Sequence, residues 1–146
     1  YSVAQHCLLV EDILGRLKPT ARPAERLHAL LHDAPEYVIG DMISPFKAAL
    51  GLDYRAFEER LLAAVHIRFG LPPEPPAALA KLVKRADRLA AWFEATQLAG
   101  FSEREAARFF PRPRFRGAAE IRLSARPTTA VKEAYLARFA GLGGGA

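Results

Sequence analysis

The sequence contains a single cysteine, Cys7, among its 146 residues. One cysteine cannot form an internal disulfide, and it excludes a zinc site built from several cysteines. No apolar run approaches the roughly 18–20 residues that a membrane-spanning helix needs. A signal peptide, with a basic segment followed by a short apolar one, is not visible either. These absences predict a cytoplasmic protein without a membrane partner.

The composition is that of an ordinary globular protein, with 51% hydrophobic and 25% charged residues. A chain of this length fits one domain and can bury about two-thirds of its unfolded surface. Collagen, coiled-coil and disordered classes are therefore excluded. We expect one domain over residues 1–142 and a flexible tail over residues 143–146. Because the sequence begins with Tyr1 and not with Met, we also expect residues upstream.

The formal net charge is +5, and part of the excess basic charge is local. Five arginines share one segment with a single acid, Glu120: Arg112, Arg114, Arg116, Arg122 and Arg126. Such a stripe attracts phosphate-bearing partners. Pro111, Pro113 and Gly117 interrupt the segment, which favours a solvated loop instead. We do not expect nucleic acid as a partner.

The apolar residues recur with helical spacing along the chain. Val3, Cys7, Val10 and Leu14 follow one helix face, and Gly15 predicts its end. Further helices are predicted over residues 24–33, 36–40, 54–69, 77–98, 102–109 and from Thr128 or Thr129 to about Gly141. Asp53 is a plausible N-cap, and Ser102 with Glu105 forms a capping-box pattern. No strand alternation or repeat is visible, so we predict an all-α, compact single-domain bundle of about six or seven helices.

Four residues suggest metal chemistry: His6, the adjacent pair His32-Asp33, and Asp87. They fall on three predicted helices, and helical bundles build metal sites from side chains on facing helices. Imidazole with carboxylate suits Mn, Co, Fe or Zn. Each residue alone is more typical of an ordinary surface or core position. Neighbouring helical residues point about 100° apart, so His32 and Asp33 can share one ion only near a helix end.

Acidic residues continue after this pair, at Glu36 and Asp41, and Lys47 follows. A carboxylate near a metal ion can take a proton from the attacking water. A lysine can hold a phosphate as a point charge. The alternative is that Glu36 caps the turn after Pro35 and that Lys47 is solvated.

Three segments together resemble the HD-domain metal-dependent phosphohydrolases: Tyr1–His6, Ala29–Asp41 and Lys84–Asp87. A His-Asp pair alone is a weak signal. Val-Ala-Gln-His upstream, acids three and eight residues after Asp33, and the later Ala-Asp make the pattern specific. The resemblance covers Tyr1 to about Gly100 and is greatest to the branch of bacterial 5'-deoxynucleotidases and related deoxynucleoside triphosphate hydrolases.

The resemblance implies a compact helical bundle and four metal ligands: His6, His32, Asp33 and Asp87. It implies that Glu36 orients or deprotonates the attacking water. Asp41 would assist at the reacting phosphate or position its partners, and Lys47 would contact phosphate. The cofactor would be one divalent ion, namely Mn, Co, Fe, Zn or Mg.

The function implied is metal-dependent hydrolysis of a nucleotide phosphate ester, of the 5'-nucleotidase or the deoxynucleoside triphosphate hydrolase type. A small-molecule nucleotide would be the substrate. The alternative is a sensor module that binds metal or nucleotide without turnover. Relatives place an arginine and an aromatic residue upstream of the first ligand to hold the nucleotide, whereas here the sequence starts five residues before His6. Members of the branch often pair, so the resemblance also allows a homodimer.

Four further residues have a weaker claim to a role at the site. His28 lies one helical turn before His32, and the expected role is at the surface or in support of the ligands. His66 faces either the cleft or the bundle, and we favour a structural role. Trp92 and Phe93 are predicted core residues, with base stacking as the alternative.

Overall fold

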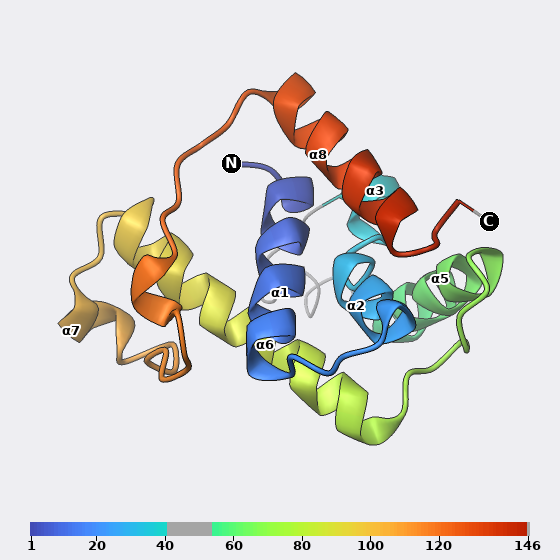
Figure 1. The fold of residues 1–146 in the computed structure, drawn as a ribbon, viewed down its shortest axis with the longest axis horizontal. Coiled ribbons are helices and arrows are strands. Elements are labelled where there is room, and N and C mark those ends of the chain that lie inside the picture. The colour runs from blue at the N-terminus through green and yellow to red at the C-terminus, as the bar shows by residue number, and fades with distance from the viewer. Residues whose placement is uncertain (41–53, 146) are drawn as a thin grey trace.

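The computed structural model describes residues 1–40 and 54–145, and these residues form helices joined by loops, without a strand (Figure 1). The elements are α1 (Val3–Leu17), α2 (Pro23–Leu30), α3 (Glu36–Ile39), α5 (Tyr54–Arg68), α6 (Ala77–Gln97), α7 (Glu103–Ala106), the short 3-10 helix η1 (Ala118–Glu120) and α8 (Thr128–Gly141). The predicted all-α bundle of six or seven helices is confirmed for this part of the chain. None of the described helices is long and apolar enough to cross a bilayer.

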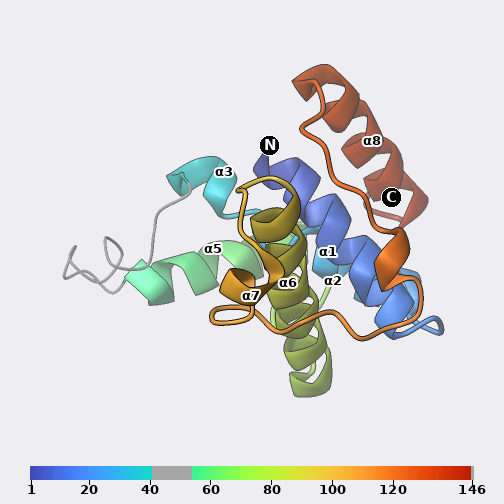
Figure 2. The same cartoon turned by 90° about the vertical axis from the view of Figure 1, so that its left-hand side faces the viewer.

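Helix α1 is the central element and packs against α6, α2 and α8. In Figure 2, α6 stands in front, with α3 and α5 on one side of it and α1, α2 and α8 on the other. Val10, Ile13 and Leu14 of α1 are almost completely buried against the α6 side chains Leu89 and Phe93. Each such side chain contributes about 1.5–3 kcal/mol when fully buried. The apolar face of α1 that the sequence predicted therefore packs against α6 in this core.

A second apolar cluster joins α1 and α2 to the C-terminal helix. Cys7, Leu27 and Leu30 are buried in it, with Phe69 and Phe139 packed beside them. Trp92 belongs to the first cluster and is buried, so its predicted place in the core is confirmed. Helix α1 contributes to both clusters, with Cys7 in this one and Val10 and Leu14 in the first.

Helix α1 does not end at Gly15, as the sequence predicted, but continues to Leu17. A Cβ at Gly15 would lie 2.6 Å from Nη2 of Arg26. The absent side chain therefore makes room for the guanidinium of Arg26, which comes from α2. Glycine can adopt the helical conformation at a cost of about 1 kcal/mol relative to alanine, so Gly15 does not end the helix. Its role is to let α2 pack closely against α1.

Helix α2 ends at Leu30, three residues earlier than the predicted Asp33. Pro35 disfavours helical geometry just before it. Residues 31–35 form turns, in which the amide of Ala34 donates to the carbonyl of Leu31 and the amide of Glu36 donates to that of Asp33. His32 and Asp33 therefore lie in a turn between α2 and α3, where successive side chains are not held to helical directions.

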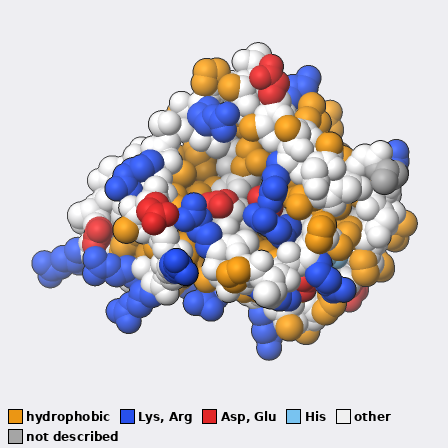
Figure 3. Space-filling view, viewed as in Figure 1, with side chains coloured by type: hydrophobic (Ala, Val, Ile, Leu, Met, Phe, Trp, Pro, Cys, Tyr) orange, Lys and Arg blue, Asp and Glu red, His pale blue; other side chains and the backbone are white. Residues whose placement is uncertain are grey.

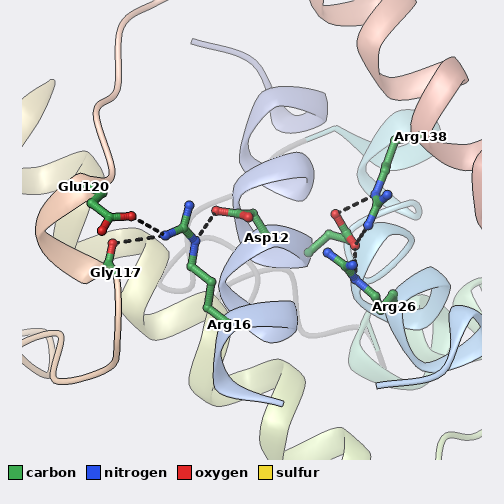
Figure 4. Close-up of polar contacts among 7 residues, drawn as sticks. Asp12, Arg16, Arg26, Gly117, Glu120 and Arg138 are labelled. Carbon is green, nitrogen blue, oxygen red and sulfur yellow. Dashed lines mark hydrogen bonds and ion pairs between the residues drawn. The ribbon is translucent and has the colours of Figure 1, made fainter. Parts of the chain in front are cut away.

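Glu11 ties three helices together (Figure 4). Its side chain is only 4% exposed and lies between two arginines. Arg138 of α8 donates from Nε to Oε2 at 2.9 Å and from Nη2 to Oε1 at 2.6 Å, while Arg26 of α2 forms an ion pair on the other side. A bidentate, charge-assisted pair of this kind fixes geometry as well as adding energy. The clamp holds α2 and α8 on α1.

Two glutamines hold the extended segment 121–126, which the sequence predicted to be loop. Gln97 donates to the carbonyl of Ile121 at 3.1 Å and accepts from the amide of Leu123 at 2.8 Å. Gln5 donates to the carbonyl of Ser124 at 2.7 Å and accepts from the amide of Arg126 at 3.2 Å. Because a side-chain amide has one donor end and one acceptor end, each glutamine satisfies two backbone groups.

Other local predictions were right in part. The capping box of Ser102 and Glu105 is present at the start of α7. Helix α8 begins at Thr128, but its N-cap is Pro127 and no threonine caps it. Asp53, the predicted cap of α5, lies outside the described residues.

The basic segment carries its predicted exposed charge: Arg112, Arg114, Arg116, Arg122 and Arg126 are all exposed. Arg112 pairs with Glu103, and Arg122 donates to the carbonyl of Ala119 at 2.6 Å. Figure 3 shows Lys and Arg side chains scattered over one face and not gathered in a single patch.

Candidate metal centre

His6, His32, Asp33 and Asp87 converge at one end of the α1–α6 contact. His6 lies near the start of α1, His32 and Asp33 lie in the turn after α2, and Asp87 lies on α6. Nε2 of His6 is 3.4 Å from Oδ2 of Asp33 and 3.4 Å from Oδ1 of Asp87. Nε2 of His32 is 3.2 Å from Oδ2 of Asp33. The structure therefore brings together all four residues that the resemblance assigned as ligands.

The two imidazoles are oriented through their Nδ1 atoms. Nδ1 of His6 donates to Oε1 of Glu94 at 2.6 Å, and Nδ1 of His32 donates to the carbonyl of Ala29 at 2.8 Å. Both acceptors lack a proton to give, so each Nδ1 carries the hydrogen. Each Nε2 then faces the carboxylates, to which it presents a hydrogen when the ring is protonated and a lone pair when the ring is neutral. Metal-binding histidines show this same arrangement, in which an outer acceptor fixes the tautomer.

The Nε2 atoms of the two histidines and the two aspartate carboxylates can all accept hydrogen bonds. Since they face one another, positive charge between them is needed to offset their repulsion. Burial would lower the pKa of His6, but hydrogen bonds to Asp87 and Glu94 raise this pKa to about 10. Burial likewise opposes protonation of His32, while Asp33 and Cys7 raise its pKa well above the ordinary value. Protons can supply the charge, and so can a divalent cation, which would displace them.

The donor set fits a divalent metal ion. Ligand atoms of His6, His32 and Asp87 lie within 4.8 Å of one another. Among the described residues, the buried Nε2 of His32 makes no hydrogen bond, although the Asp33 carboxylate is close by. A buried nitrogen without a hydrogen bond needs an explanation, and a bound cation supplies one. Imidazole nitrogens with carboxylate oxygens suit Mn, Fe, Co or Zn more than Ca, which prefers oxygen alone.

Sequence reasoning missed two residues beside these four. Glu94 lies two helical turns after Asp87 on α6, and the two carboxylates contact opposite nitrogens of the His6 ring. That spacing was readable as one helix face. Cys7, next to His6, is buried and groups with His32 and Asp33 within 4.8 Å. Its contact with the centre depends on the turn after α2, which local sequence does not describe.

A polar cavity of about 310 Å³ opens beside the centre, lined by residues that include His6, Asp33, Glu36 and Glu94. Glu36 begins α3, three residues after Asp33, and lines this cavity. Asp41 and Lys47, the other residues predicted to act on phosphate, lie outside the described residues.

A second cavity, of about 320 Å³, includes His32, Asp87 and Lys84 in its lining. Lys84 lies one turn before Asp87 on α6, so its positively charged side chain lies at the edge of the metal centre. His28 and His66 line the same cavity.

His28 and His66 form a buried pair rather than a metal site. Nδ1 of His66 donates to the carbonyl of Pro73 at 2.9 Å, which leaves its Nε2 to accept from Nδ1 of His28 at 3.3 Å. His66 is buried but also lines the cavity that contains His32 and Asp87, so its structural role stays a prediction. His28 was expected at the surface or in support of the ligands. The surface role is wrong, because only 4% of His28 is exposed, and the supporting role stays a prediction.

Comparison with known proteins agrees with this geometry. Residues 3–92 match the HD domain family. An uncharacterised protein of Rhodobacter capsulatus is 53% identical over 141 residues, which cover 94% of this chain and 70% of that protein. The Escherichia coli protein YfdR, also uncharacterised, is 36% identical over 89 residues, which cover 59% of this chain and 45% of YfdR. The match spans well over half of the chain and includes all four converging residues, so the chain belongs to the HD domain family.

Proposed function

We propose that this chain is a metal-dependent phosphohydrolase that acts on a nucleotide phosphate ester, of the 5'-nucleotidase or deoxynucleoside triphosphate hydrolase type. Membership of the HD family supplies the coarser statement, since the family belongs to a superfamily of metal-dependent phosphohydrolases. That the substrate is a nucleotide, with either one or three phosphates, goes beyond family membership and is our proposal.

One observation carries the proposal: two imidazole nitrogens and two carboxylates converge beside a polar cavity that Glu36 also borders. His6, His32, Asp33 and Asp87 would hold the ion. When bound, a divalent ion at this position lowers the pKa of water and offsets negative charge at phosphorus.

The chain's own residues would then act in order. Glu36 accepts a proton from the attacking water, whose oxygen forms a bond to phosphorus. The bond between phosphorus and the ester oxygen breaks, and that oxygen takes up a proton. The products are an alcohol and phosphate for a monoester, or an alcohol and triphosphate for a triphosphate.

Cationic side chains would steady the phosphate during this reaction. Lys84 borders the cavity that contains His32 and Asp87, so it is the described lysine best placed for this role. A lysine acts on phosphate as a point charge without a strict geometry. Lys47 and Asp41 keep the roles that the resemblance implies, as part of the proposal.

The test is incubation of the protein with a panel of ribo- and deoxyribonucleoside mono- and triphosphates, each with Mn²⁺, Co²⁺, Mg²⁺ or EDTA, with products identified by mass. Metal-dependent release of a nucleoside would support the proposal. Phosphate as the second product would indicate a nucleotidase, and triphosphate would indicate a triphosphate hydrolase. Asp33→Ala should lose both bound metal and activity, whereas Glu133→Ala, an exposed carboxylate on α8, should keep both. Saturable nucleotide binding without turnover under any metal would overturn the enzyme and favour the sensor module.

A further inference from the structure

An apolar cavity of about 500 Å³ adjoins the polar cavity of the metal centre. The two share three lining residues, Val3, Asp33 and Glu36. This volume lies within the range of small-molecule pockets, which are mostly apolar with a few polar groups at one side. The shared residues place its polar side at the proposed reaction centre.

The described walls of this cavity come from α1, α3, α5, α8 and the turn after α2. Buried Cys7 and Leu31 line it, together with Phe69, Tyr135 and Phe139. The rings of Phe69 and Phe139 meet edge to face, with centroids 4.8 Å apart. The wall thus includes three aromatic side chains that are packed or hydrogen-bonded, Phe69, Tyr135 and Phe139, while Tyr37 at its edge is 95% exposed.

Few side-chain polar groups face into this cavity from the described residues. Asp33 and Glu36 lie at the shared border. The hydroxyl of Tyr135 donates to the backbone carbonyl of Leu30 at 3.1 Å, so its proton is already used. A ligand group in the cavity is therefore held by contact with rings and aliphatic carbons more than by hydrogen bonds.

A phosphate ester has a charged part and an organic part, and the two adjoining cavities match them. The phosphate belongs with the ligand residues and the polar cavity. We propose that the apolar cavity holds a flat aromatic ring of the substrate's organic group, such as a nucleobase, and selects for the ring by contact. Polar edges of a base would find few partners there, and unpartnered polar groups resist burial. The chain would therefore require a ring while discriminating weakly between bases.

This inference rests on the proposed function and adds a role for the C-terminal helix. Tyr135, Leu136 and Phe139 of α8 line the cavity, yet α8 lies outside the 3–92 segment that matches the family. Arg138, on the same helix, is the residue that Glu11 clamps. The ring-binding wall is thus fixed to α1, the helix that carries His6.

Leu136 is the position at which to test the cavity, because its side chain is 53% exposed and a change there need not disturb the core. The kinetics of thymidine 5'-monophosphate and of 2-deoxyribose 5-phosphate, which lacks the ring, would be compared in the metal-loaded wild type. Leu136→Glu would place a charge at the cavity wall. Glu133→Ala, exposed on the same helix and absent from the cavity lining, is the matched control.

We expect the wild-type KM for the ring-free ester to exceed that for the nucleotide by about tenfold or more. Leu136→Glu should raise KM for the nucleotide more than for the ring-free ester, with Mn²⁺ affinity by calorimetry equal to that of wild type. Glu133→Ala should change neither KM. Equal KM values for the two esters in wild type, or an equal effect of Leu136→Glu on both, would overturn the cavity assignment while leaving the phosphohydrolase intact. Turnover of neither these esters nor any of the nucleotides would overturn the proposed function and this inference with it.

Discussion

The carboxylate of Glu94 lies 2.6 Å from Nδ1 of His6, on the side of the ring opposite to Asp87. Both acids project from one face of α6, so a single rigid helix supplies one proposed ligand and the group that orients another. The hydrogen bond sets the tautomer of His6 and makes its Nε2 a better electron donor. Glu94 is therefore a positioning residue for the metal centre.

Replacing Glu94 should weaken metal binding without removing a ligand. We expect Glu94→Ala to lower Mn²⁺ affinity by about 10–100-fold, the usual cost of losing such an outer partner. Glu94→Gln should lose less, because its amide oxygen still accepts from Nδ1 of His6. Titration calorimetry on both variants measures the effect, with Glu133→Ala as control. An unchanged affinity in Glu94→Ala would remove Glu94 from the centre.

Replacing Glu11 should destabilise the fold far more than replacing an exposed acid. Glu11→Ala leaves Arg26 and Arg138 without the carboxylate that lies between them, and breaking a buried ion pair costs about 3 kcal/mol or more. Glu120 also pairs with an arginine, Arg16, but its side chain is 79% exposed. Glu120→Ala should cost less than about 1 kcal/mol. Urea unfolding gives both values, and similar losses would mean that the clamp contributes little.

The buried pair of His28 and His66 should make stability depend on pH. Burial, with His66 nearby, lowers the pKa of His28 from 6.5 to about 4, and burial also lowers the pKa of His66. The unfolded chain therefore takes up protons near pH 6.5 that the folded chain refuses. Their contribution to stability is complete above pH 6.5 and is lost as the pH falls toward about 4, by at most about 1.4 kcal/mol per pH unit for each histidine.

Among the described residues, the other acids and histidines with shifted pKa values titrate outside this window. Because the pKa values of His6 and His32 are raised in the folded protein, both states hold those protons below pH 6.5. Glu25, whose pKa is lowered from 4.5 to about 2 by its hydrogen bonds to Lys18 and to the Arg22 backbone, affects stability only at lower pH. Urea unfolding in EDTA between pH 6.5 and about 4.5 should give a steeper pH dependence for wild type than for His28→Gln. Parallel curves would show that His28 titrates normally.

The fold was predictable because each long helix buries one apolar face, and that face repeats along the sequence at helical spacing. Prediction was wrong where the cause lay in another element. Gly15 leaves room for the guanidinium of Arg26 on α2, so it does not end α1. Helix α2 ends at Leu30 because residues 31–35 form turns. Local sequence contains the glycine and the proline but does not show which distant side chain needs the room.

The candidate site shows the same limit. His6, His32, Asp33 and Asp87 were identified by resemblance to a family motif, and the structure brings their side chains together. Glu94 could have been found from its helical spacing to Asp87. The contact of His28 with His66 spans 38 positions, and the aromatic wall from α8 lies beyond the motif, so neither has a signal in the local sequence.

A substitution at Glu36 should reduce catalysis without reducing metal binding, so it is the most informative single change. Its side chain borders both the polar and the apolar cavity, three residues after Asp33. Glu36→Gln keeps the size of the side chain but cannot accept the proton of water at neutral pH. We expect metal affinity to change little, while kcat falls by about 10²–10⁴-fold, the usual contribution of a general base.

The control for Glu36 is the pH profile. With Glu36 as the base, the wild-type rate should fall on the acidic side as that carboxylate is protonated, and this limb should disappear in Glu36→Gln. Asp33→Ala should instead lose metal and rate together, because it removes a proposed ligand. Full activity in Glu36→Gln would move the role of base to another group. A parallel loss of metal in Glu36→Gln would place Glu36 among the ligands.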